Sequence, residues 1–346
     1  MIINERIESF AILGQWLRKG LKEVMNGKGN ELSIAIKKAE IENPWFTEDS
    51  VVNSLQSIAG WLDPKVLDNW AGHYHLSEPV KAKKIAVIMA GNIPLVNFHD
   101  FLSVLITGHH FIGKLSSQDK VLLPFLVSKL VELNSHWKES ISFTEERLDT
   151  FEAVIATGSN NTSRYFQYYF SRYPHIIRNN RNSVAVLTGT ESIEDLHCLY
   201  SDIFEYYGMG CRNVSILLVP TGYNFPQLFD IWEALPNPTD HYKYKNNYDY
   251  YRSIYLINSQ KHFDTGYVSV LKADSVASPL SVLHYKEYKD SGEVNHFLKL
   301  NLSGIQCIVS KVPIQGFSTI QPGKAQQPEI MDYPDGVDII QFLLAL

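Results

Sequence analysis

The chain has 346 residues, more than one hydrophobic core usually organises, so the length predicts two intertwined domains with a helical appendage. With 45% hydrophobic and 20% charged residues, it has the composition of an ordinary globular protein. The net charge of −6 gives no electrostatic reason to bind phosphate polymers, which argues against nucleic acid as a partner.

Residues 1 to 78 have the pattern of a helical N-terminal region. A stripe of apolar residues recurs there at three- and four-residue steps, which predicts an amphipathic helix packed on a neighbour. A membrane-surface role would also fit the basic residues beside the stripe, but acidic residues nearby weaken it. A further helix is expected after Thr47, a suitable N-cap. The stripe consists of Phe10, Leu13, Leu17, Leu21 and Val24.

From residue 81 the pattern changes to short β-rich runs that alternate with helical stretches, the signature of parallel βαβ units. The first set has strands at 83–91, 110–115 and 152–158, helices at 94–108 and 121–133, and a helix that follows the last strand to about residue 172. The second set has strands at 175–179, 183–189, 214–220 and near 254, 268 and 305, with a helix over 192–207. Two α/β layers are therefore expected.

The segment 241–258 is rich in tyrosine and contains Lys243, Lys245 and Arg252. Single-stranded nucleic acid sites share this composition. A tyrosine-rich loop or subunit contact is the interpretation that better fits an acidic chain.

The N-terminus lacks the basic start, continuous apolar run and cleavage site of a signal peptide. No stretch approaches the roughly 20 apolar residues that a membrane-spanning helix needs. Three cysteines, an odd number, do not make a disulfide framework. We therefore expect a cytoplasmic protein with reduced thiols.

The sequence Gly91-Asn92-Ile93-Pro94 stands where the first strand hands over to a helix. At the carboxyl end of a parallel strand, a side-chain amide can donate to a developing oxyanion. The alternative is that Asn92 only caps the helix.

Two further turns follow strands of the first set. Lys114, Ser116 and Ser117 can hold the ribose and the 2′-phosphate of a dinucleotide through ammonium and hydroxyl donors. Gly158 and Ser159 lead into a helix whose N-terminal amides suit a pyrophosphate. Taken alone, each is equally an ordinary turn or a solvated charge.

Cys211 is the candidate nucleophile among the three cysteines. Gly208 and Gly210 leave room for a substrate to reach its sulfur, and Arg212 next to it is expected to lower the thiol pKa below about 8.5. Cys307 alternates with apolar residues along a strand, so we expect it in the core, and Cys198 lies within a helix.

These motifs occur in an order that resembles the aldehyde dehydrogenase superfamily, and most closely its LuxC-type (luminescence-type) long-chain fatty acyl-CoA reductases. The resemblance covers residues 80 to 220 and extends to the tail at 320–340. It implies two Rossmann-like α/β domains: a helical region at 1–78, a nucleotide-binding domain at 79–190, a catalytic domain at 191–310, and a segment at 311–346 that returns to the cleft or the nucleotide domain.

The resemblance also implies roles for individual residues. Cys211 falls on the catalytic cysteine and Asn92 on the asparagine of the oxyanion hole. Lys114 falls on the lysine that holds the cofactor ribose, and Gly158 and Ser159 on the turn that holds the pyrophosphate.

Two departures from the superfamily pattern refine the prediction. The strand before the cysteine has no carboxylate until Glu191, whereas aldehyde-oxidising members use a glutamate base to hydrolyse their intermediate. Ser117 stands where NAD-preferring relatives often carry a glutamate. The first departure favours CoA-linked reduction, and the second favours NADPH, with NADH as the alternative.

The resulting prediction is NADPH-dependent reduction of a fatty acyl-CoA, or another acyl thioester, to an aldehyde through a thioacyl group on Cys211. The alternatives are a cysteine-dependent acyltransferase or thioesterase without hydride transfer, and a non-catalytic partner of an acyl-activating protein. An acyl-activating enzyme or acyl carrier protein is the expected partner, and a homo-oligomer stays open. The pairs His73 with His75 and His109 with His110 lack a third ligand at a characteristic spacing, so no metal is expected.

Overall fold

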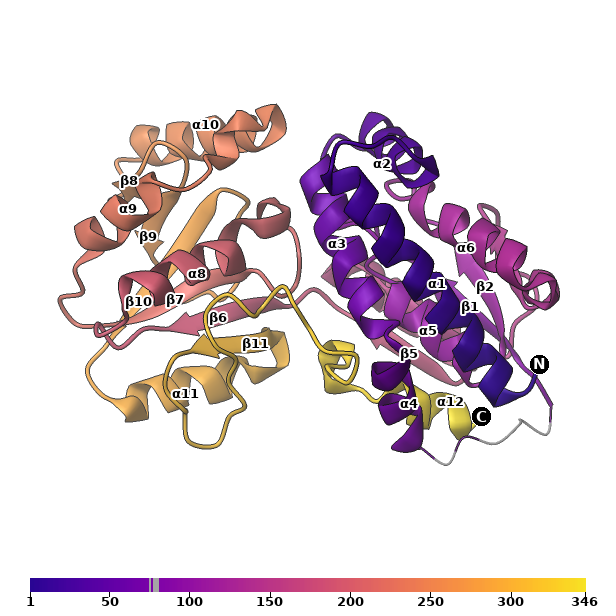
Figure 1. The fold of residues 1–346 in the computed structure, drawn as a ribbon. Helices are drawn as coiled ribbons and strands as arrows, with labels where there is room; N and C mark the ends of the chain where they lie inside the picture. The colour runs from indigo at the N-terminus through magenta and orange to yellow at the C-terminus, as the bar shows by residue number, and fades with distance from the viewer. Residues whose placement is uncertain (75, 77–80) are drawn as a thin grey trace. The chain divides into compact units, whose positions relative to one another are not determined.

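The chain folds into two units in the computed structural model, which describes residues 1–74, 76 and 81–346 (Figure 1). The first unit comprises Met1–Asn179 and Glu329–Leu346, and the second comprises Asn180–Pro328. The boundary expected between residues 78 and 79, and His75, lie outside the described residues.

The first unit is built on a parallel sheet with the strand order β3-β2-β1-β4-β5. This is the order of a Rossmann half, in which ligands bind beyond the carboxyl ends of the strands. Because the strand interiors are covered on both faces, Ile85, Val87 and Ile155 are fully buried. The strands are β1 (Lys84–Ile88), β2 (His110–Lys114), β3 (Ile141–Thr144), β4 (Ala153–Thr157) and β5 (His175–Arg178).

The N-terminal helices belong to this first unit. The predicted apolar stripe of α1 is at most 7% exposed, and α1 packs on α3, α4, α5 and α6, so its apolar face is used inside the protein. Thr47 caps α3 by accepting from the Ser50 N–H at 3.4 Å, as predicted. The helices are α1 (Ile3–Met25), α2 (Glu31–Glu42), α3 (Glu48–Trp61), α4 (Pro64–Gly72), α5 (Phe98–Ile106), α6 (Leu122–Leu133) and α7 (Asn160–Phe170).

The second unit holds a sheet with the order β11-β6-β7-β10-β9-β8, parallel except for the β8 and β9 pair. The strands are β6 (Asn182–Val186), β7 (Val214–Pro220), β8 (Phe263–Asp264), β9 (Ser269–Lys272), β10 (Val282–Tyr288) and β11 (Ile305–Ser310). The helices are α8 (Ile193–Phe204), the short 3₁₀ helix η2 (Glu205–Gly208), α9 (Phe225–Glu233), α10 (Tyr242–Ile257) and α11 (Ser291–Asn301).

Two of the predictions for this part of the chain differ from the observed structure. The strand expected near residue 254 is wrong, because the tyrosine-rich segment forms helix α10, which buries Tyr244, Tyr248 and Tyr255. The strand at 183–189, expected in the domain that ended at 190, belongs here as β6, because it pairs with β7 and β11. The division between units therefore comes at 179/180.

The C-terminal segment returns to the first unit from residue 329 onward. Helix α12 (Ile339–Leu344) packs on α5 and buries Ile339, Ile340 and Leu343 to 1% exposure or less. Residues 311–328, which we expected in the same segment, stay with the second unit. Within the described residues, no helix is both long and apolar enough to cross a membrane.

The α/β architecture with two Rossmann-like halves and helices at the N-terminus agrees with the predicted fold class.

Candidate active site

The turn that carries Asn92 follows β1 at the carboxyl edge of the first sheet. Asn92 is exposed, and α5 begins only at Phe98, with Asn97 as its N-cap residue. Asn92 is therefore not the N-cap residue of α5, which was the alternative role considered for it. Asn97 instead holds the turn, because its Oδ1 accepts from the Ala90 N–H at 2.8 Å.

The Asn92 turn packs directly on the turn that carries Ser116 and Ser117. A Cβ on Gly91 would lie 2.5 Å from the Ser116 Oγ, so only glycine allows this approach. Asp119 closes the second turn and accepts from the Leu95 N–H at 3.0 Å, holding a residue with a φ of 56°. The structure thus brings the predicted oxyanion residue and the predicted ribose residues together.

Lys114, Ser116 and Ser117 lie at or just beyond the end of β2. The Lys114 Nζ donates to the carbonyl oxygen of Glu146 at 3.1 Å, and the Ser116 Oγ accepts from the Gln118 N–H at 3.2 Å. Ser117 is exposed at the corner of the turn. These side chains present ammonium and hydroxyl groups at the edge where a Rossmann half binds its ligand.

Gly158 and Ser159 form the turn between β4 and α7, as predicted. Ser159 caps α7 by accepting from the Thr162 N–H at 3.3 Å. A Cβ on Gly158 would lie 3.0 Å from the Phe166 ring, so the glycine lets the helix start close to the sheet. The N-terminus of a helix is a suitable anion site, because its first amides and its dipole favour negative charge.

A buried polar network that the motifs did not indicate underlies these turns. Arg178, at the end of β5, forms an ion pair with Asp100 of α5 at 2.7 Å, and both are at most 5% exposed. Burial alone would raise the pKa of Asp100, but the Arg178 guanidinium outweighs it and holds that pKa below its usual range. Asn97 donates to the same carboxylate at 2.9 Å and to the Thr157 Oγ1 at 3.4 Å. The ends of β1, β4 and β5 are therefore fixed to one another.

Cys211 lies in the turn that leads into β7, in the second unit. The buried Asn213 holds this turn: its Oδ1 accepts from the Gly210 N–H at 2.8 Å, and its amide donates to backbone carbonyls at the end of α8. Tyr206 and Tyr207 before it have positive φ values of 52° and 57°, followed by Gly208 at 78°. A fixed backbone of this kind orients a nucleophile.

Ser183 of β6 is a neighbour of Cys211 that the motifs missed. Its Oγ donates to the Cys211 carbonyl at 3.1 Å and lies 2.9 Å from the Cys307 Sγ. We expected Cys307 in the core, but it is half-buried. The reason is that β11 is the edge strand of the second sheet. The signal for Ser183 is a polar residue at the start of an otherwise apolar strand, which is ambiguous in sequence.

Cys198 is placed on α8, as predicted. Burial first, and then the negative charges of Glu194 and Asp202, raise its thiol pKa. A raised pKa disfavours the thiolate, which is the nucleophilic form. This setting makes Cys198 the weaker candidate for covalent chemistry.

Arg212 directs its Nε to the carbonyl oxygen of Ala325. The segment around Ala325 is held by Asp202, which accepts from the N–H groups of Gly323 at 2.6 Å and Ala325 at 2.8 Å. Burial raises the pKa of Asp202 to about 6. The cysteine turn, the end of α8 and residues 323–325 are therefore joined within the second unit.

Glu191, the first carboxylate after β6, lies at the opposite edge of the second sheet from Cys211. It follows the carboxyl end of β6, while Cys211 precedes the amino end of the parallel β7. Its carboxylate accepts from the N–H groups of Thr188 at 2.6 Å and Gly189 at 3.0 Å. Glu191 is therefore not placed as a base for Cys211.

The predicted residues thus form two groups, one in each unit. Asn92, the ribose residues and the Gly158 turn share the carboxyl edge of the first sheet, and Cys211 lies at the amino edge of the second. His109, considered as a metal ligand, accepts from the Lys83 N–H through Nδ1 and donates to the Leu343 carbonyl through Nε2. Both of its ring nitrogens are occupied by the backbone.

Comparison with solved structures shows what the fold is similar to. A putative aldehyde dehydrogenase from Burkholderia cenocepacia aligns with a TM-score of 0.62 at 12% identity, covering 90% of this chain and 74% of that one. The NAD⁺ complex of an aldehyde dehydrogenase from Bacillus cereus gives 0.61 at 13%, covering 90% and 72%. A NAD-dependent benzaldehyde dehydrogenase from Corynebacterium glutamicum gives 0.66 at 11%, covering 89% and 76%. At these identities the likeness shows the fold alone.

Comparison of the sequence with curated proteins gives no match. The model of the LuxC acyl-CoA reductase family, however, matches residues 18–225, which is more than half of the chain and includes Asn92, the two predicted cofactor turns and Cys211. The chain therefore belongs to the LuxC acyl-CoA reductase family and is an oxidoreductase with the aldehyde dehydrogenase fold.

Proposed function

We propose that the protein reduces an acyl thioester, with coenzyme A as the favoured carrier, to the aldehyde through a thioacyl group on Cys211. The observation that carries this proposal is the turn of Cys211, fixed by Asn213 and Ser183 at the start of β7. In this reaction the Cys211 thiolate attacks the thioester carbonyl, and the carrier leaves as its thiol. The Asn92 amide and the Cys211 N–H would stabilise the intervening oxyanion.

The residues around Cys211 support reduction over hydrolysis. Hydrolysis of a thioacyl group needs a base that activates water, and Glu191 is at the far edge of the sheet. Exchange of the acyl group with a thiol needs no such base. The acyl group on Cys211 would therefore persist until it is reduced.

We propose a nicotinamide cofactor at the carboxyl edge of the first sheet, and NADPH as the preferred one. Lys114, Ser116 and Ser117 would hold the ribose and its 2′-phosphate, and Gly158 and Ser159 the pyrophosphate. The fit rests on the exposed N-terminus of α7 and on the hydroxyl groups at the end of β2. When bound, the cofactor supplies the hydride that converts the thioacyl group to the aldehyde.

An acyltransferase or thioesterase that uses Cys211 without hydride transfer is the alternative. It would leave the Lys114 and Ser159 turns, the proposed cofactor residues, without a role in the chemistry. An acyl-activating enzyme or an acyl carrier protein is the donor that we propose as partner.

The test is to mix the purified protein with acyl-CoAs of graded length and NADPH or NADH, following cofactor absorbance and aldehyde. Cys211→Ala should abolish both aldehyde formation and covalent labelling by radioactive acyl-CoA, whereas Cys198→Ala and Cys307→Ala should keep the label. Labelling without cofactor oxidation would favour the transferase. Labelling that survives in Cys211→Ala would overturn the assignment of the nucleophile.

A further inference from the structure

Both strands that flank β6 shift their register beside Ser183. There β7 has one extra residue, Ser215, and β11 places two residues, Gln306 and Cys307, opposite Ser183 alone. Shifts of this kind re-aim side chains and are frequent next to functional sites. The shift on β11 accounts for the contact between Cys307, on an edge strand, and the buried Ser183.

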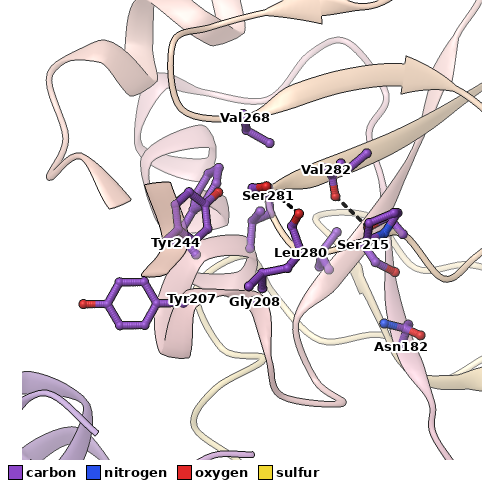
Figure 2. A pocket seen from close by; sticks show the side chains of 14 residues that line it. Asn182, Tyr207, Gly208, Ser215, Tyr244, Val268, Leu280, Ser281 and Val282 are labelled. Carbon is purple, nitrogen blue, oxygen red and sulfur yellow. Dashed lines mark hydrogen bonds between the residues drawn. The ribbon is translucent and has the colours of Figure 1, made fainter. Parts of the chain in front are cut away.

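The extra residue on β7 belongs to a different part of the unit. Ser215 lines a cavity of about 30 Å³ beside η2 and the start of β10 (Figure 2), and its Oγ donates to the Val276 carbonyl at 2.6 Å. Among the described residues, the cavity lining includes none of residues 209–213. The contacts on the cysteine turn that are relevant here therefore come from β6 and β11.

Ser183 holds the cysteine turn at two points. It is fully buried, its backbone N–H donates to the Asn213 carbonyl at 3.1 Å, and its Oγ donates to the Cys211 carbonyl at 3.1 Å. The Asn213 side chain accepts from the Gly210 N–H at 2.8 Å. The backbone of the nucleophile is therefore held both before and after its Cα atom.

The Cys307 thiol extends this arrangement into a chain of hydrogen bonds. A serine hydroxyl has one hydrogen, and that of Ser183 goes to the Cys211 carbonyl. The hydrogen between the Cys307 Sγ and the Ser183 Oγ, which are 2.9 Å apart, therefore comes from the thiol. The same Sγ lies 4.0 Å from the carbonyl oxygen of Arg212, the next one along the turn. Linked hydrogen bonds polarise one another, so the thiol strengthens the bond that Ser183 makes.

We infer that Ser183 and Cys307 are positioning residues for the acylation of Cys211, and that Cys307 acts through the Ser183 hydroxyl. In this role they set the direction of the Cys211 side chain and of its N–H, the proposed oxyanion donor, before the thioester arrives. A reacting group misplaced by about 1 Å can cost about 100-fold in rate. The inference rests on the proposed function, because it concerns the rate at which Cys211 takes the acyl group.

The test of Ser183 is the single-turnover rate at which radioactive palmitoyl-CoA acylates Cys211 in the full-length protein. Ser183→Ala should slow this rate by about two- to tenfold, the usual worth of one hydrogen bond. The half-saturating concentration of palmitoyl-CoA should stay within about twofold, because Ser183 acts on the backbone of the nucleophile. Ser269→Ala, which changes a fully buried serine of β9 in the same sheet, is the matched control and should keep the wild-type rate.

The test of Cys307 uses its alanine and serine variants. Cys307→Ala should keep the label but acquire it about threefold more slowly, whereas Cys307→Ser retains a donor and should have the wild-type rate. Cys198→Ala is the matched control. Because Cys307 acts through Ser183, the double alanine variant should be no slower than Ser183→Ala. A double variant slowed by the product of the two single effects would overturn the role given to Cys307.

Alkylation by iodoacetamide separates positioning from a change in the thiol itself. This reaction needs the Cys211 thiolate but forms no carbonyl oxyanion, so Ser183→Ala should keep the alkylation rate within about twofold from about pH 6 to about pH 9. Mass spectrometry follows the modification of Cys211, and thermal melting shows that each variant is folded. An equal fall in the acylation and alkylation rates would overturn the inference, because Ser183 would then act on the protonation or exposure of the thiol.

Two different failures are distinguishable. If wild-type Cys211 is acylated and Ser183→Ala and Cys307→Ala react as fast as their controls, the inference is wrong and the proposed function stands. If no acyl-CoA acylates Cys211 in the wild type, the proposed function fails and this inference fails with it.

Discussion

At the scale of single residues, buried polar side chains hold the backbone of both groups of candidate residues, one group in each unit. Asn213 is 2% exposed and ties the cysteine turn to α8, while Ser183 is fully buried and bonds to the Cys211 carbonyl. Asp119 does the same for the turn of Asn92, because its carboxylate accepts from the Leu95 N–H. Such contacts hold reactive groups in one geometry before the substrate binds, so less conformational freedom is lost in the reaction.

Asn92→Ala should slow aldehyde formation by roughly 10²–10³-fold, the usual cost of one oxyanion donor. Cofactor binding should stay almost unchanged, because Asn92 is exposed and Asn97 holds the turn. Single-turnover acylation rates and cofactor titration measure the two effects. A loss of cofactor affinity with an intact acylation rate would place Asn92 in the cofactor site instead.

Ser117→Glu should shift the cofactor preference toward NADH. A carboxylate at this exposed corner would accept from both ribose hydroxyls of NADH and repel the 2′-phosphate of NADPH. Like charges at about 4 Å repel by roughly 1–4 kcal/mol, so the ratio of kcat/KM values should change by about five-fold to several hundred-fold. An unchanged ratio, or a wild type that already prefers NADH, would contradict the assignment.

At the scale of elements, the candidate residues of the first unit follow strands, and Cys211 of the second unit precedes one. The carboxyl ends of β1, β2 and β4 carry the Asn92, Ser116 and Gly158 turns. Hydrogen bonds and an ion pair among Asn97, Asp100 and Arg178 join the ends of β1, β4 and β5. In the second unit, the segment 323–325 lies against the end of α8. In each unit, the ends of the strands are the rigid scaffold that positions the candidate residues.

Asp202→Asn should destabilise the second unit by about 1–3 kcal/mol, because one of the two backbone N–H groups of Gly323 and Ala325 loses its acceptor. The difference should depend on pH. Since burial raises the folded-state pKa of Asp202 to about 6, the folded state binds its proton more tightly than the unfolded state.

The wild type therefore gains about 1 kcal/mol from this group as the pH falls from 7 to 5, and the variant does not. Urea denaturation of both proteins at pH 7 and pH 5 measures the gap in the free energy of unfolding, which should widen at pH 5. An unchanged gap at pH 5 would show that Asp202 has a normal pKa, and a narrower gap that its pKa is lowered; either result would contradict this prediction.

At the scale of the whole molecule, the chain passes from the first unit to the second after Asn179 and returns at Glu329. The returning segment completes the first unit. His99 donates to the Ile330 carbonyl at 2.8 Å, and Ile340 of α12 is 1% exposed. The stability of the unit that carries Asn92 therefore depends on the last residues of the chain.

Ile340→Ala should lower the free energy of unfolding of the first unit by about 2–5 kcal/mol, the cost of a cavity in a packed core. Leu344→Ala, on the same helix but 40% exposed, should change it by less than about 1 kcal/mol. Thermal and urea denaturation of both variants measures the difference. Equal effects would contradict the packing of α12 on this unit.

The sequence by itself determined the local structure and the order of the motifs. Apolar spacing predicted α1 and its buried face, and the strand at 214–220 matches β7, because periodicity reflects burial directly. The order of Gly91-Asn92, Lys114, Gly158 and Cys211 was sufficient to indicate the family that the comparison then confirmed.

Only the tertiary structure decided which residues meet. The same residue types that form Asp100–Arg178 occur elsewhere as solvated charges, and no spacing joins residues 78 positions apart. Likewise, β6 belongs to the second unit through its pairing with β7 and β11, and the tyrosine-rich segment 241–258 became helix α10 because that helix buries Tyr244, Tyr248 and Tyr255. Pairing and burial between distant segments are set by the packed chain, so local pattern cannot supply them.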